Sequence, residues 1–167
     1  PMFVAIFAGL LGENAMFGLK VAQHLLLVGM SGIVFKIGTE LDETRRLGLL
    51  AGVLSAFSLQ IQGYARIPMT ELLFTFLCMS ALWLSIRYVR RGGSAVFLGA
   101  IFIFSLAALV RPIAQYLNYM LLFVPIMRLV LPNWNFLWPE DGSRCRRRQL
   151  VTLLCGVVLH AAVILPY

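Results

Sequence analysis

Six long apolar stretches, separated by short polar connections, constrain this chain more than any other feature of its sequence. A transmembrane helix needs about 20 mostly apolar residues, because the hydrocarbon core of a bilayer is about 30 Å thick. The stretches predict an all-α integral membrane protein, a polytopic bundle of about six transmembrane helices that forms one domain over residues 1–167. The predicted spans cover residues 17–38, 47–63, 70–89, 95–110, 113–131 and 150–167.

The composition agrees with a membrane protein and disfavours a nucleic-acid-binding one. Hydrophobic residues make up 60% of the chain and charged residues only 13%, whereas soluble domains average about 45–50% and about 25%. A net charge of +7 would suggest nucleic acid in a soluble protein. Here it is explained by basic cytoplasmic loops, so we expect no nucleic-acid partner. The three cysteines lack metal-ligand spacing, and we expect no metal site formed by them.

The basic residues fall mainly on one side of the predicted membrane. Eleven of the 14 follow the first, third or fifth span, and only Lys20, Arg66 and Arg111 fall on the other side. Because lysine and arginine favour cytoplasmic loops, the odd-numbered spans should end in the cytoplasm. The connections at residues 64–70 and 111–112 then face the periplasm of a bacterium or the lumen of a eukaryotic organelle. We therefore expect a multi-pass protein of the bacterial inner membrane or the endoplasmic reticulum membrane.

The two outward connections carry the first candidate site residues, Glu71 and Arg111. Glu71 follows Thr70 at a predicted helix start, where a carboxylate interacts favourably with the helix dipole. It could also face a water-filled cavity and bind a sugar hydroxyl or an amine. Arg111 is followed by Pro112 and could snorkel to lipid headgroups. Alternatively, its guanidinium could bind a phosphate through two parallel hydrogen bonds.

Other polar residues near these connections leave similar alternatives open. Arg66 has the same two interpretations as the arginine of the second connection. Tyr64 could hydrogen-bond a phosphate or a sugar, or belong to the interfacial aromatic belt. Gln115 and Asn118 lie on nearly one helix face and could extend a polar pocket inward or join two helices. His160 stands alone in the last predicted span.

Several segments resemble the GT-C membrane glycosyltransferases that are similar to dolichyl-phosphate-mannose protein mannosyltransferases and bacterial aminoarabinose transferases. One segment runs from Tyr64-Ala65-Arg66 through Thr70-Glu71-Leu72-Leu73-Phe74-Thr75-Phe76-Leu77 and Ala81-Leu82-Trp83-Leu84 to Arg87. Another joins Leu98-Gly99 to Ala107-Ala108-Leu109-Val110-Arg111-Pro112. Residues 1–14 and 164–167 also resemble the family, so that the resemblance covers nearly the whole chain with degenerate motifs.

The resemblance implies transfer of a sugar from a polyprenyl-phosphate-linked donor to a protein, lipid or glycan on the non-cytoplasmic face. In such enzymes the catalytic carboxylate lies in the first outer loop, upstream of residue 1, so no catalytic residue is expected here. By position the resemblance assigns substrate or lipid-phosphate binding, and a divalent cation could assist the phosphate. The residues are Tyr64, Arg66, Glu71, Arg111 and Gln115.

The expected partners are the polyprenyl-phosphate sugar donor, membrane lipids and partner membrane subunits. Because the carboxylate loop is missing, enzymatic activity stays an open question for this segment. The alternative is a catalytically silent scaffold or accessory subunit of a larger complex. A small transporter is less favoured, because no span has an acidic residue at its middle and there is no inverted repeat.

Overall fold

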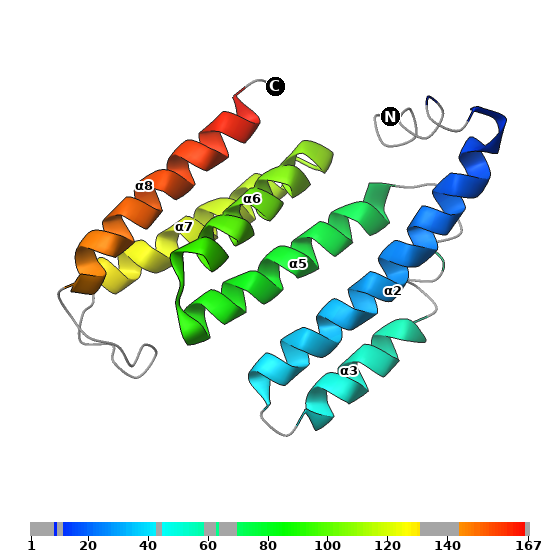
Figure 1. Ribbon diagram of the computed structural model, residues 1–167, viewed down its shortest axis with the longest axis horizontal. Coiled ribbons are helices and arrows are strands. Elements are labelled where there is room, and N and C mark those ends of the chain that lie inside the picture. The colour runs from blue at the N-terminus through cyan, green and yellow to red at the C-terminus, as the bar shows by residue number, and fades with distance from the viewer. Residues whose placement is uncertain are drawn as a thin grey trace. The chain divides into compact units, whose positions relative to one another are not determined.

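The computed structural model describes residues 9, 12–42, 45–58, 63, 70–130 and 144–165, without the side chains of 127–130 and 144–149. Every described element is a helix, which confirms the all-α prediction for this part of the chain (Figure 1). The chain divides into two compact units, Pro1–Met79 and Ser80–Tyr167, with the boundary inside α5. The elements are η1 (Gly12–Asn14), α2 (Ala15–Leu41), α3 (Arg46–Ala56), α5 (Thr70–Arg91), α6 (Ser94–Val110), α7 (Ala114–Val130) and α8 (Arg144–Ile164).

Two of the described helices are long and apolar enough to cross a membrane. They are Gly12–Leu41, which joins η1 to α2, and α5. Helix α3, helix α6 and residues Leu150–Ile164 of α8 are apolar but shorter. Helices α2, α5, α6 and α7 begin and end within a few residues of the predicted spans. Two of the six predicted spans therefore have the length and composition of a helix that can cross a membrane.

The predicted span over residues 47–63 is wrong in its extent. Helix α3 has 11 residues and ends at Ala56, so it is about 16 Å long against about 30 Å of hydrocarbon. Its end has a local cause. The Ser58 N–H bonds to the Ser55 carbonyl at 3.3 Å, a tighter turn than the α-helical one, and the helix stops there.

Helix α8 differs from the prediction at its start. It begins at Arg144, whereas the predicted span begins at residue 150. The basic run 144–148 therefore has a helical backbone rather than a loop. Arginine is among the better helix formers, and its unfavourable position near a helix N-terminus costs only about 0.3–1 kcal/mol per exposed charge. Residues 2–11, an apolar stretch too short to span a bilayer, lie outside the described residues except for Gly9.

Helices α2 and α3 form an antiparallel hairpin with very close backbones (Figure 1). Gly38 faces Gly48 directly, and a Cβ at either position would overlap the opposite helix. At Gly48 it would lie 2.7 Å from the Phe35 carbonyl oxygen, and at Gly52 it would lie 3.1 Å from Phe35 Cβ. The spacing Gly48-x3-Gly52 is the small-residue pattern with which helices approach one another in membranes.

The other face of α2 packs against the N-terminal half of α5 in the first unit. The buried residues of α2 recur at helical spacing, and Gln23 is one of them. The apolar part of this contact is a small core rather than a large one. It consists of Met30 and Leu72, with Leu26, Leu27 and Phe76 packed against them.

In the second unit, α6, α7 and α8 pack against one another, and α6 has the most buried residues of the three among those described. Phe97, Ala100 and Ile101 have no exposed surface. Helix α8 runs parallel to α6 (Figure 1). Thr152 of α8 donates a hydrogen bond at 2.8 Å to Ser94 at the start of α6, and His160, further along α8, meets Ser105, further along α6. The C-terminal halves of these helices meet α7 at a group of polar side chains.

Candidate functional site

Three polar side chains meet inside the second unit, one from each of α6, α7 and α8. They are Ser105, Asn118 and His160, called the polar cluster below. Asn118 Nδ2 lies 2.6 Å from His160 Nδ1 and 2.9 Å from Ser105 Oγ. Ser105 Oγ lies 3.0 Å from the same imidazole nitrogen. Hydrogen bonds between the three side chains therefore link three helices at one point.

The hydrogen-bond directions of the polar cluster follow from its donor atoms. In the orientation that the structure gives the Asn118 amide, its nitrogen donates and His160 Nδ1 accepts with its lone pair. Ser105 also donates to the Ile101 carbonyl, one helical turn earlier, at 2.8 Å. The imidazole is consequently neutral, with its proton on Nε2. The ring of Tyr119 packs edge-on against it, at 5.5 Å between ring centres.

Burial is nearly complete at the polar cluster. Ser105 and Asn118 have no exposed surface, and His160 is 8% exposed. Asn118 Oδ1 is buried and has no hydrogen-bond partner among the described residues. A buried polar group without a partner costs about 1–3 kcal/mol, so this atom sets the polar cluster apart from a fully satisfied network.

A serine beside a histidine is also the arrangement of a nucleophile and its base. Here that chemistry is disfavoured, because Ser105 has no exposed surface through which a substrate could reach it. The arrangement instead fixes the relative positions of three helices. Of the two interpretations of Asn118, the structure supports the one in which its side chain joins helices. The interpretation of His160 as an isolated residue is wrong, because a linear sequence does not show which helices become neighbours.

The residues predicted to bind substrate fall in different parts of the structure. Glu71 is in the first turn of α5, where it is partly buried, and it belongs to the first unit. Arg111 and Gln115 belong to the second unit and share the turn between α6 and α7. Tyr64 and Arg66 lie outside the described residues. The structure thus brings together two of the five predicted residues, within one turn.

Backbone hydrogen bonds build that turn. The Arg111 N–H bonds to the Ala107 carbonyl at 2.9 Å and caps α6, and the Gln115 N–H bonds to the Pro112 carbonyl at 3.0 Å. Arg111 itself has an extended backbone and an exposed side chain. These hydrogen bonds therefore fix the end of α6 and place Arg111 at its C-terminal cap.

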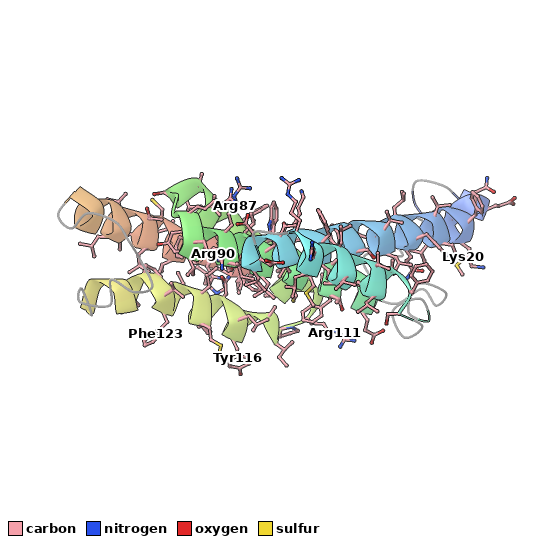
Figure 2. The ribbon with its side chains drawn as sticks, turned by 90° about the horizontal axis from the view of Figure 1, so that it is seen from below. Lys20, Arg87, Arg90, Arg111, Tyr116 and Phe123 are labelled. Carbon is pink, nitrogen blue, oxygen red and sulfur yellow. The ribbon has the colours of Figure 1, made fainter. Side chains whose placement is uncertain are left out.

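An apolar face of α7 leads away from Arg111. Tyr116, Met120 and Phe123 follow one another at helical spacing and are 69%, 72% and 55% exposed. Figure 2 shows Arg111, Tyr116 and Phe123 on the same side of the second unit. Gln115 is partly buried. A cation at the end of an exposed apolar face suits an amphiphile with an anionic head.

A metal site is not visible in the described part of the chain. No three His, Cys, Asp or Glu side chains are grouped there. The predicted divalent cation therefore stays a prediction, and Arg111 is the cationic group that the structure places at this turn.

The polar cluster had a signal in the sequence that residue-by-residue reading misses. Ser105, Asn118 and His160 each lie five to seven residues from the outward end of a predicted span. Residues at equal depth in neighbouring helices can meet, because each helix rises about 1.5 Å per residue. Counting depth from the predicted ends would have placed the three together.

Fold and polar cluster define a helical protein with apolar exterior faces and polar residues between its helices. No protein-family model matches the chain, and neither a curated protein nor a solved structure matches it. Its function is therefore inferred from its own residues.

Proposed function

We propose that this chain is the membrane-embedded helical part of a GT-C-type glycosyltransferase. It would serve the transfer of a sugar from a polyprenyl-phosphate-linked donor to a protein, lipid or glycan on the non-cytoplasmic face. Its partners would be that donor, membrane lipids and further membrane subunits. Its location would be the bacterial inner membrane or the endoplasmic reticulum membrane.

The distribution of side chains supports a membrane environment. Large hydrophobic side chains are exposed on each of the six described α-helices, whereas Gln23, Asn118 and His160 are buried. Only 17% and 22% of the two long apolar segments are buried, although a core helix of a soluble protein is mostly buried. Exposed apolar faces of this extent are unfavourable in water, but they are the natural surface of a helix in lipid.

The observation that carries the donor proposal is the position of Arg111. Its exposed side chain stands at the end of the α6–α7 turn, and the apolar face with Tyr116 and Phe123 begins beside it (Figure 2). A polyprenyl phosphate has the matching chemistry, namely an anionic head and a long apolar tail. The resemblance of the segment Leu109-Val110-Arg111-Pro112 to the transferase family points to the same ligand.

The test is binding of a long-chain polyprenyl phosphate to the full chain in micelles of a detergent without phosphate. Unphosphorylated polyprenol is the control ligand. We expect Arg111→Ala to weaken phosphate binding about 10-fold or more, because a hydrogen bond to a charged group contributes about 1.5–3 kcal/mol. Arg111→Lys should retain part of the affinity, since it keeps the charge but loses the planar fork.

The matched control is Arg90→Ala, which removes another exposed arginine at the C-terminal end of α5. It should leave polyprenyl phosphate binding unchanged. If the wild-type chain binds polyprenol and polyprenyl phosphate equally well, the donor proposal is wrong. A folded chain with that behaviour would instead support the silent scaffold. In the full-length enzyme, Arg111→Ala should lower use of the lipid-linked sugar about 10-fold or more.

A further inference from the structure

We infer that His160 is a proton-binding site, and that a proton taken up there releases α8 from α6 and α7. The polar cluster would then be an acid-sensitive lock on the packing of the second unit. This inference rests on the geometry of Ser105, Asn118 and His160 and is independent of the proposed transferase function.

The surroundings of Asn118 indicate the direction of its hydrogen bond to His160. Asn118 Nδ2 is surrounded by three acceptors, since the Ile101 carbonyl lies 3.4 Å away in addition to His160 Nδ1 and Ser105 Oγ. Such a position suits a donor group. A proton on His160 Nδ1 would place one N–H against another at 2.6 Å, and the bond would become a repulsion.

Turning the Asn118 amide over would remove the repulsion between the two N–H groups but would cost other contacts. The turned amide would offer Oδ1 to a protonated His160, but the same movement would bring that oxygen toward the Ile101 carbonyl. It would also place the NH2 group where Oδ1 now lies, at a position where the structure shows no hydrogen bond to Asn118. Turning the amide also removes the hydrogen bond that Asn118 Nδ2 now donates to Ser105 Oγ. Protonation therefore costs the polar cluster a hydrogen bond in either orientation of Asn118, because the bond to His160 is lost in one and the bond to Ser105 in the other, at about 1–3 kcal/mol.

The side chains that face the His160 imidazole carry no negative charge. Tyr119 faces it from α7 and Ser105 faces it from α6, and neither is a counter-ion. The sequences of α6, α7 and α8 contain no Asp or Glu. An imidazolium at this position would have no ion-pair partner among these helices, and a buried unpaired charge is strongly unfavourable. The charged residues on these helices are all cations, namely Arg128, Arg144, Arg146, Arg147 and Arg148. The connections between the helices carry Arg111 and, outside the described residues, Glu140 and Asp141.

The expected pH dependence follows from proton linkage. In the packed state His160 Nδ1 accepts a hydrogen bond and stays unprotonated. In the released state the imidazole resembles that of a free histidine, which takes up its second proton at about pH 6.5. Stability therefore falls as the pH drops below about 6.5, because the released state binds more protons. Between pH 8 and pH 5.5 the unfolding equilibrium constant should rise about 10-fold.

The experiment compares reversible unfolding of the full chain in detergent micelles at pH 8 and pH 5.5. Carboxylates titrate at about pH 4 and therefore contribute little to a change in stability between these two pH values. His160→Gln should remove the acid sensitivity, because a glutamine does not titrate. The matched control is His24→Gln, which replaces the other histidine of the chain. His24 is exposed, with Nδ1 2.7 Å from the Lys20 carbonyl of its own helix, so this variant should behave like the wild type.

A spectroscopic measurement tests the same inference without disturbing the polar cluster. In the His24→Gln variant the only histidine signals come from His160. Nitrogen-15 spectra at pH 8 should show a neutral imidazole with its proton on Nε2. A proton on Nδ1 at that pH would overturn the inference. Equal acid sensitivity of the wild type and His160→Gln would overturn it as well.

Discussion

Gly156 allows α8 to lie directly against α6, and enlarging it should weaken the second unit. A Cβ at this position would lie 2.5 Å from Ile101 Cδ1, 3.1 Å from Phe97 Cε1 and 3.5 Å from Leu122 Cδ2. Ile101 and Phe97 have no exposed surface, so neither can move outward. The isoleucine is also restricted by its β-branch, which leaves one strongly preferred rotamer in a helix.

Two opposing effects determine how far a substitution at Gly156 changes the free energy of unfolding. Overpacking a filled core costs about 1–3 kcal/mol, whereas alanine in place of a mid-helix glycine gains about 1 kcal/mol. Gly156→Ala should therefore lower the free energy of unfolding by about 0–2 kcal/mol. Gly156→Val adds two more methyl groups to the same space and gains less helix propensity. We expect it to cost about 3 kcal/mol or more.

The assay is reversible unfolding in detergent micelles, with matched substitutions at Gly32. Gly32 lies inside α2, and nothing is within 4 Å of a Cβ built there. Gly32→Ala should gain up to about 1 kcal/mol through helix propensity alone, and Gly32→Val should stay near the wild type. If the Gly156 variants are as stable as their Gly32 counterparts, close contact between α6 and α8 is not what limits residue size at position 156.

Two further substitutions test the other contacts between helices. Gly48→Val should open the α2–α3 hairpin, because its Cβ would lie 2.7 Å from a backbone carbonyl oxygen of α2; faster amide hydrogen exchange in α3 is the readout, and unchanged exchange would contradict the close packing. Ser105→Ala should lower stability by about 1 kcal/mol more than Ser85→Ala, because both hydroxyls bond to a carbonyl four residues back but only Ser105 also accepts from Asn118. Equal losses for the two serine variants would show that the hydrogen bond between helices contributes nothing.

The sequence predicts the helices well where an apolar run ends in a residue that stops it. Thr70 follows Pro68 and begins α5, and Pro112 follows the last residues of α6. Such signals act on the local backbone, so they can be interpreted without knowing what packs nearby. The run over residues 47–63 has no such signal at Ala56. Its apolar side chains predict burial in lipid, but they do not report where the backbone leaves the α-helical pattern.

Much less of the candidate site was predictable, for a different physical reason. The sequence identifies Arg111 as a cation at a helix end, because that property depends only on the chain around it. It identifies Asn118 and His160 as polar residues in apolar helices, but their meeting depends on how three helices pack. The exposed faces of α7 and α8 also carry large apolar side chains, so apolar character alone does not indicate which face of either helix turns inward.

These exposed apolar faces also bear on which contacts hold the helices together. In the proposed lipid environment, apolar side chains gain little by moving from lipid to a helix interface, so helices would associate through close backbone contact and hydrogen bonds. The first unit uses the first means, with Gly48 and Gly52 against α2. The second unit combines both, with Gly156 beside α6 and the polar cluster one turn further along α8. Small and polar residues between the helices, rather than the many exposed leucines, should therefore determine the stability of each unit.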